Sequence, residues 1–405
     1  MGVSTALPRV LTPVFLRLLV GNFLYFMTFA TFFLLPIYIH QLGGNDQTVG
    51  LVMGISGASS LVGVFVVAAL IDRVGARLFS RIGFAGMALV ALAFSTIDHL
   101  GPELFALRVV QGLVFACGFN GNSTLVVMLA PPERRAAALG FFGISTLTTH
   151  ALAPAIGEQV AALVGFRVLF GVVAAFSALG LALTWSLAGP TPRHIGRRSA
   201  PLPVSTTLVT TIAATALCGV SFGSVMTFVP TFTMLAGLGP VATFFLSYTS
   251  AAIGSRFFAG SLADRVGHAR VILPGMFMLA LSIAALATVE STWQLVAVGI
   301  WFGLSQGVVF PTLNAWTVGL GALEQIGRIQ SIFNGAFNVG ITLGALGFGP
   351  VVARFGHRPM FVAAGGASLG ALGLFATACA AHVRDLAPLH AATDEPPAAG
   401  PELGA

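Results

Sequence analysis

The four residues Asp72-Arg73-Val74-Gly75 end a long apolar run in the first half of the chain, and the same four recur as Asp264-Arg265-Val266-Gly267 in the second half. Each quartet is a short charged turn between two segments that are apolar enough to cross a membrane. Each is followed by a further arginine, Arg77 or Arg270. A repeated turn in an otherwise apolar sequence predicts a chain built from two copies of one unit.

The composition of the chain indicates an integral membrane protein. Of the 405 residues, 56% are apolar and only 8% are charged, whereas a soluble surface normally needs about a quarter charged residues. Apolar runs long enough to cross roughly 30 Å of hydrocarbon recur along the whole length. They predict twelve membrane-spanning helices at 13–39, 48–71, 79–98, 104–130, 135–161, 165–188, 205–234, 241–263, 270–289, 292–316, 329–353 and 359–382.

The basic residues lie mostly on one side of these predicted spans. All 19 are arginines: 14 fall on the side of the two repeated turns, three on the other side and two, Arg108 and Arg256, inside spans. This asymmetry follows the positive-inside rule and predicts cytoplasmic termini in a bacterial cytoplasmic membrane. The net charge of +6 therefore reports topology rather than nucleic-acid binding. Three isolated cysteines in apolar runs predict neither a disulfide nor a metal site.

A polar, proline-rich segment divides the predicted spans into two sets of six. We expect a first six-helix bundle over residues 1–188, a cytoplasmic linker over 189–204 and a second bundle over 205–382. The remainder, 383–405, is rich in proline, alanine and acidic residues, which predicts a disordered cytoplasmic tail.

Further matches between the two halves support a duplication. Met27–Phe32 in the first predicted span is similar to Met226–Phe232 in the seventh, and Gln111–Phe115 in the fourth is similar to Gln306–Phe310 in the tenth. Because each half has six spans, the copies are expected to be parallel repeats about an axis normal to the membrane. The predicted fold is an all-α membrane protein of twelve helices in two pseudo-symmetric bundles.

These segments resemble the major facilitator superfamily of secondary transporters. Gly260–His268 is similar to that family's signature turn between spans 8 and 9, Ala68–Arg77 to the turn between spans 2 and 3, and Arg108–Gly112 to its motif on span 4. The chain departs from the turn motif at Ala68, Ala76 and His268. The resemblance covers all twelve spans and implies transport by alternating access, with a binding site near the midplane between the halves.

The resemblance also implies a gating role for the charged turns. The carboxylates of Asp72 and Asp264 would latch the two halves on the cytoplasmic side in one conformational state, and a solvated loop charge is the alternative. Arg256 is a charge inside a predicted span without an evident acidic partner, and we expect it at a cavity or gate near the cytoplasm. The predicted gating residues are Asp72, Arg73, Arg77, Asp264, Arg265 and Arg256.

Three ionisable residues within spans are candidates for proton coupling. Arg108 lies about one turn into its span, with Gln111 and Asn122 on the same helical face. Glu158 lies at a similar depth in the next, antiparallel span and could pair with Arg108, while His150 lies two turns deeper. Either these groups bind a proton in competition with the substrate, or Arg108 and Glu158 form a fixed ion pair and His150 is a satisfied core residue.

Polar side chains in the apolar spans are candidates for substrate contact, with interhelical hydrogen bonding as the alternative. The family's cavity is lined by spans 1, 4, 7 and 10, which favours ligand contact for the candidates on spans 1, 4 and 10. Span 11 carries a stripe of such groups that includes Asn334 and Asn338, for which bonding between helices is the stronger interpretation. The candidates are Asn22, Tyr25, Gln111, Asn122, Gln306, Asn334 and Asn338.

The functional prediction is proton-coupled efflux of a small, partly apolar organic compound by a monomer without a cofactor. Residues 153–158 match the family's antiporter motif in part. The chain contains no lysine, so it has no phosphate-binding loop for ATP, and no nucleophile and base set indicates an enzyme. The alternatives are uptake of a small metabolite and a membrane sensor or scaffold that transports nothing.

Overall fold

The computed structural model describes residues 11–131, 134–187, 205–322 and 325–393. All regular secondary structure in these residues is helical. Eleven helical segments are long and apolar enough to cross a membrane, and α9, with 26 residues, is the twelfth long helix. The elements are α1 (Pro13–Thr31), η1 (Phe32–Leu34), α2 (Leu35–Gln41), α3 (Asp46–Val74), α4 (Ala76–Phe94), α5 (Pro102–Leu129), α6 (Arg135–Val164), α7 (Phe166–Thr184), α8 (Thr206–Leu235), α9 (Val241–Val266), α10 (His268–Ala285), η3 (Leu286–Thr288), α11 (Thr292–Gly319), α12 (Ile326–Phe355) and α13 (His357–Thr393).

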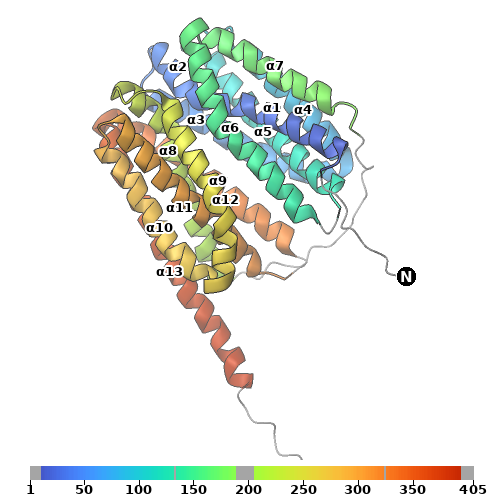
Figure 1. Ribbon diagram of the computed structural model, residues 1–405, viewed down its shortest axis with the longest axis vertical. Coiled ribbons are helices and arrows are strands. Elements are labelled where there is room, and N and C mark those ends of the chain that lie inside the picture. Colours follow the sequence, from blue (N-terminus) through green and yellow to red (C-terminus); the bar gives the residue numbers. More distant parts are fainter. Residues whose placement is uncertain (1–10, 132–133, 188–204, 323–324, 394–405) are drawn as a thin grey trace, which may run out of the picture.

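The helices form two bundles with the same internal packing. In the first bundle α3 packs on α5, α4 packs on α5 and α7, and α1 packs on α6 and α7. In the second, α9 packs on α11, α10 packs on α11 and α13, and α8 packs on α12 and α13. Figure 1 shows the blue-to-green and yellow-to-red helices as two bundles lying side by side. The duplicated fold predicted from the sequence is confirmed.

The repeated quartets make the same turn in both bundles. Gly75, with φ of 96°, separates α3 from α4, and Gly267, with φ of 94°, separates α9 from α10. Each glycine N–H donates to a carbonyl four residues earlier, at 2.8 Å to Ile71 and 2.9 Å to Ala263. A side chain disfavours this positive φ, so glycine is the residue that lets two long helices reverse within one residue.

The two bundles contact each other along two pairs of helices, α3 with α12 and α6 with α9. On α3, Gly50, Gly54 and Gly57 lie directly against α12; a Cβ at Gly50 would lie 2.5 Å from the carbonyl oxygen of Ala345. Small residues allow this close approach of two backbones. The close contact begins at the end of the molecule that carries Asp46, which we call the Asp46 end.

The opposite end, which carries the two repeated turns, is called the Asp72 end. Ala68 and Asp72 on α3 are exposed, as is Asp264 on α9. Among the described residues, neither aspartate forms an ion pair or a side-chain hydrogen bond. The bundles are therefore in contact at the Asp46 end, while the charged turns at the Asp72 end are not engaged with each other.

The helix boundaries differ from the predicted spans mainly at the two ends of the chain. The first span is interrupted by η1 and then continues through α2, and α13 continues through Thr393. Part of the predicted disordered tail, 383–393, is thus helical. The predicted linker, 189–204, lies outside the described residues.

Candidate functional site

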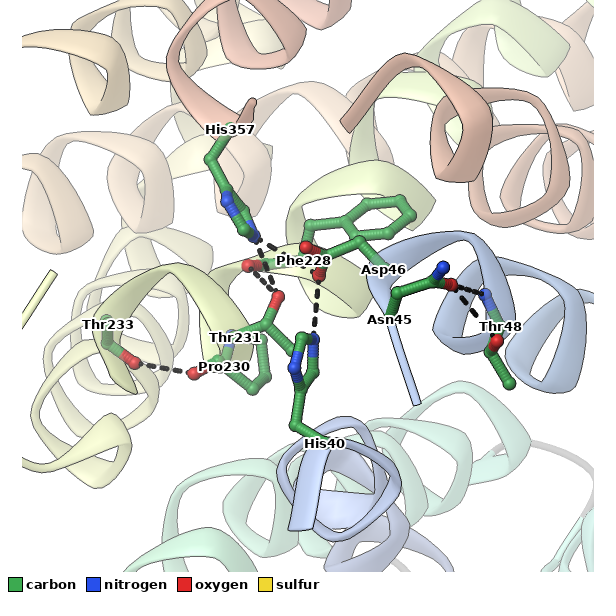
Figure 2. A network of polar contacts seen from close by, with 9 residues as sticks. All are labelled: His40, Asn45, Asp46, Thr48, Phe228, Pro230, Thr231, Thr233 and His357. Carbon is green, nitrogen blue, oxygen red and sulfur yellow. Dashed lines mark hydrogen bonds and ion pairs between the residues drawn. The ribbon is translucent and has the colours of Figure 1, made fainter. Parts of the chain in front are cut away.

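A carboxylate and two imidazoles meet at the Asp46 end, where the two bundles touch. Oδ1 of Asp46 lies 3.2 Å from Nε2 of His40 in α2 and 3.4 Å from Nε2 of His357 in α13. Nε2 of His357 also lies 2.9 Å from the hydroxyl of Thr231 in α8. Figure 2 shows Asp46 between the two rings, with one ring supplied by each bundle. We call Asp46, His40, His357 and Thr231 the Asp46 cluster.

The local sequence explains the positions of Asp46 and His357 in the Asp46 cluster. The side chain of Asn45 accepts a hydrogen bond from Thr48 N at 2.9 Å and caps α3, which places Asp46 in the first turn. Gly356, with φ of 83°, ends α12 and brings His357 to the start of α13. The described residues contain no group of three or more His, Cys, Asp or Glu side chains that could hold a metal ion.

Glu158 forms a second contact between the bundles at the Asp46 end. Its carboxylate accepts hydrogen bonds from the backbone N–H groups of Val241 and Ala242, at 3.0 and 2.9 Å. These are unpaired donors in the first turn of α9, where the helix dipole also favours a negative charge. A hollow of about 480 Å³, lined in part by Glu158, Phe166 and Val241, adjoins this contact.

Arg108 and Glu158, which the sequence suggested could pair, do not form an ion pair in this structure. Arg108 is 3% exposed and donates to Val52 O at 3.1 Å, to the sulfur of Met53 at 3.3 Å and to the side-chain oxygen of Gln111. The guanidinium therefore joins α5 to α3 within the first bundle. The spans were correctly judged to be antiparallel, but the side chain turns towards α3 rather than towards α6.

His150 lies on α6 at the boundary between the bundles. Its ring packs edge-on against Phe33 with centroids 5.0 Å apart, and Phe33 stacks on Phe245 of α9 with centroids 5.4 Å apart. Nδ1 of His150 is buried and has no hydrogen-bond partner among the described residues. The structure therefore does not show the satisfied core histidine of the structural interpretation.

Aromatic side chains continue from Phe33 along the first bundle. Phe29 lies 6.0 Å from Phe33 and stacks on Phe115 at 4.2 Å, and Phe115 stacks on Phe119 at 5.8 Å. All four rings are half-buried. We call them the aromatic strip; it leads from the contact with α9 along α1 and α5.

The second bundle has a related set of half-buried rings. Phe222 of α8 lies 5.6 Å from Phe337 of α12, which lies 4.8 Å from Phe310 of α11. Phe310 occupies the position in α11 that corresponds to that of Phe115 in α5, by the match of Gln306–Phe310 with Gln111–Phe115. Each bundle thus carries partly exposed aromatic surface on its two central helices.

Several predicted substrate contacts are hydrogen-bonded within the first bundle. The hydroxyl of Tyr25 lies 3.2 Å from the carbonyl oxygens of Val114 and Phe115, and Asn22 Nδ2 lies 3.3 Å from the hydroxyl of Thr146. The hydroxyl of Ser80 donates to Asn122 Oδ1 at 2.6 Å. Together with Gln111, these side chains hold α1, α4, α5 and α6 together in this conformation.

The candidates in the second bundle are less engaged with neighbouring helices. Gln306 is 7% exposed, and its Oε1 has no partner among the described residues. Asn338 is exposed and donates to Asn334 O at 2.8 Å, which is a bond within α12 itself. The sequence interpretation favoured bonding between helices for this stripe. In this structure, however, the side chain of Asn338 bonds within α12.

The predicted gating residues lie at or near the Asp72 end. Arg73, Arg265 and Asp72 are exposed, and Arg77 is half-buried. Arg256 is exposed on α9; a Cβ added to Gly143 of α6 would lie 3.9 Å from its guanidinium. It thus reaches across the boundary between the bundles, and no described acidic residue pairs with it.

A separate charged cluster at the Asp46 end stays within the first bundle. Asp98 accepts from His99 at 2.8 Å and from Arg167 at 2.7 Å, and Glu103 lies 3.2 Å from His99. Hydrogen bonds from His99 and Arg167 lower the pKa of Asp98, and the hydrogen bond to Asp98 and the charge of Glu103 raise the pKa of His99. This cluster joins the α4–α5 loop to α7.

Sequence reasoning overlooked the Asp46 cluster. His40, Asp46 and His357 all stood just outside the predicted ends of spans 1, 2 and 12, so they were assigned to loops. A usable signal existed, because the predicted topology placed all three on the same side of the membrane.

Comparison with known families identifies one that matches nearly the whole chain. The matching family model is that of the Major Facilitator Superfamily, and it covers residues 18–345 and 241–395.

Named relatives of similar length also match. Two proteins called "Multidrug resistance protein MdtG", from Salmonella choleraesuis (strain SC-B67) and Salmonella agona (strain SL483), are each 24% identical over 367 residues, covering 85% of this chain and 90% of theirs. Among solved structures, a mutant of the peptide transporter POT has a TM-score of 0.76 at 15% identity, covering 91% of this chain and 94% of that chain. A mutant of the nucleoside transporter NupG has a TM-score of 0.74 at 16% identity, covering 90% and 99%. At these identities the structures establish the fold alone.

Proposed function

Because the chain belongs to the major facilitator superfamily and is therefore a multi-pass membrane transporter rather than an enzyme, we propose that it exports small, partly apolar organic compounds in exchange for protons. The observation that carries this proposal is the match along 85% of the chain to relatives named as multidrug resistance proteins. Transport would proceed by alternating access, with the bundles separating at one end while they close at the other.

The aromatic surfaces support the choice of substrate class. Phe29, Phe33 and Phe115 are half-buried on the first bundle, and Phe222 and Phe337 are half-buried on the second. Rings of this kind bind flat apolar solutes by stacking and burial, with little demand for a fixed pattern of hydrogen bonds. We assign the polar contacts of the substrate to Asn22, Tyr25, Gln111, Asn122, Gln306, Asn334 and Asn338. Those that are hydrogen-bonded in this conformation would exchange these bonds for bonds to the solute.

Glu158 is our candidate for the coupling carboxylate. As an anion it is stabilised by the first turn of α9, and protonation would remove the charge that this helix end attracts. Binding of a proton and release of the contact between the bundles would then be one event. His150, two turns away on the same helix, would pass or share the proton, whereas Arg108 would contribute indirectly by holding α3 against α5.

The charged turns would complete the cycle at the Asp72 end. Asp72, Arg73, Asp264 and Arg265 are exposed while the Asp46 end is closed, so we propose that these residues, with Arg77, latch the Asp72 end in the opposite state. Arg256 would line the opening between α6 and α9.

Inverted membrane vesicles test the direction of transport. With an imposed gradient, acid inside, vesicles containing the protein should accumulate ethidium in the lumen, and Glu158→Gln should reduce the initial rate at least tenfold. Glu290→Gln is the matched control, because Glu290 pairs with Arg358 within the second bundle at 3.5 Å and should leave the rate unchanged.

The other outcomes contradict parts of the proposal separately. Gradient-driven accumulation that survives Glu158→Gln excludes Glu158 as the coupling group. Flux of candidate metabolites in the opposite direction would favour uptake, and a panel of apolar and metabolite probes that all fail to move would favour a sensor or scaffold.

A further inference from the structure

We propose that Asp46, His40 and His357 form a proton-binding latch, which holds the bundles together at the Asp46 end and closes more tightly as the solution there becomes acidic. The latch is separate from the proposed coupling at Glu158. It would make the conformational equilibrium of the transporter depend on pH even when no substrate is present.

The two imidazole rings share one oxygen atom of Asp46. Oδ1 of Asp46 is within 3.4 Å of Nε2 of both rings, and the two rings come from different bundles (Figure 2). His40 belongs to the same bundle as Asp46, so it keeps its partner when the bundles separate. His357 belongs to the second bundle and loses the carboxylate on separation.

A proton on either imidazole ring changes the contact of that ring with Asp46. In the neutral state each Nε2–H can donate to Asp46, and the hydroxyl of Thr231 lies 2.9 Å from Nε2 of His357. A proton added at Nδ1 turns either ring into an imidazolium without removing the Nε2–H. The contact then becomes an ion pair, in which the Coulomb attraction between the imidazolium and the carboxylate adds to the hydrogen bond.

The burial of the cluster limits the screening of this ion pair. The side chains of His40, Asp46 and His357 are only 16%, 12% and 11% exposed. Separation of the bundles would take His357 away from the Asp46 carboxylate, so a charged His357 makes this ion pair only in the closed state. By linkage, a proton that binds more tightly to the closed state stabilises that state as the pH falls.

The neighbouring charged groups have partners of their own and do not contact the Asp46 cluster. On α13, Arg358 pairs with Glu290, and on α12, Arg354 lies over the ring of Phe355. Glu158 of α6 is bonded to the start of α9. The remaining group at this end, Asp98 with His99, Glu103 and Arg167, forms its own ion pairs. None of these groups is within ion-pair distance of the Asp46 cluster among the described residues.

Spin labels on the two bundles measure the latch directly. Gln47 on α3 and Ala353 on α12 are exposed at the Asp46 end, so both would be replaced by cysteine in a full-length chain whose three native cysteines are changed to alanine. Electron–electron distance distributions in nanodiscs between pH 8.5 and 5.5 report the ratio of closed to open molecules. If the closed state binds one proton more than the open state, the ratio should rise as the pH falls, by up to about tenfold per pH unit.

Substitutions separate the latch from other effects of pH. His357→Gln keeps an amide donor but cannot titrate in this range, so the ratio should lose most of its pH dependence. Asp46→Asn should lower the closed fraction and flatten the response. His40→Gln should keep most of the response, because His40 stays beside Asp46 in both states. His99→Gln is the matched control, because His99 is ion-paired at the same end within one bundle, and it should respond like the parent.

The proposal is overturned if the ratio falls on acidification over this range, or if His357→Gln and Asp46→Asn both keep the parental response. Should one of these two variants fail to elute as a folded protein, the other decides the matter, because each removes one side of the same contact between the bundles. No substrate or gradient is used, so efflux can fail while the latch holds, and the latch can fail while efflux holds.

Discussion

Glu158 shows how strongly the role of a single residue depends on its partner. Its position in the sequence suggested an ion pair with Arg108, but its carboxylate instead accepts from two N–H groups at the start of α9. The guanidinium of Arg108 donates hydrogen bonds to Val52, Met53 and Gln111. Both are polar groups in an apolar bundle, and each is stabilised by backbone or amide groups that the sequence does not identify as partners.

Removing the Glu158 carboxylate should weaken closure at the Asp46 end. Glu158→Ala loses two hydrogen bonds to a helix start, a loss of about 1–2 kcal/mol, which corresponds to a roughly 5- to 30-fold lower ratio of closed to open molecules. A cysteine at Gln47 should then react faster with a membrane-impermeant maleimide. Glu103→Ala, which removes a carboxylate that pairs only within the first bundle, serves as the control; equal labelling of both variants would contradict the assignment.

The pairing of α3 with α12 depends on small residues at the level of the helix. A Cβ at Gly50 would meet the backbone of α12, at 2.5 Å from Ala345 O and 2.9 Å from Gly349 Cα. Neither backbone can move aside without moving its whole helix. The closed Asp46 end therefore requires glycine here, whereas an opened end does not.

Gly50→Val should shift the molecule towards opening at the Asp46 end. Overpacking of this kind costs about 1–3 kcal/mol, which lowers the ratio of closed to open molecules roughly 5- to 160-fold. The distance distribution between labels at Gln47 and Ala353 measures the shift. Gly347→Val on α12 is the matched control, because nothing lies within 4 Å of a Cβ at that position; a shift of the same size in both variants would show that the effect is not specific to the contact.

For the whole molecule, the equal packing of the two bundles provides the two-fold architecture on which alternating access depends. The contacts of α3, α4 and α5 in the first bundle recur as those of α9, α10 and α11 in the second. Two units of the same shape can meet at either end by a small rotation, because each presents similar helices to the other.

The orientation in the membrane follows from the arginines and is open to a simple experiment. We expect the Asp72 end in the cytoplasm, since most arginines lie there. In intact cells an impermeant maleimide should label His99→Cys but not Ser261→Cys, and inverted vesicles should reverse this pattern. Both positions are exposed at opposite ends of the molecule, so labelling of Ser261→Cys from outside the cell would contradict the orientation.

The sequence by itself determined where the helices run and that they form two related sets. Hydropathy sets the spans because hydrocarbon requires every backbone group to be bonded within a helix, and the glycines of the two quartets mark reversals that only a positive φ allows. These features depend on neighbours along the chain, and both were predicted correctly.

Only the tertiary structure decided which polar groups meet. Asp46 and His357 are more than 300 residues apart in the chain. They touch because the two bundles, to which α3 and α13 belong, are in contact at the Asp46 end. Hydropathy and helical periodicity contain no information on contacts between bundles, and such contacts change as the bundles move. The burial and charge of the Asp46 cluster thus belong to one conformation of the folded molecule.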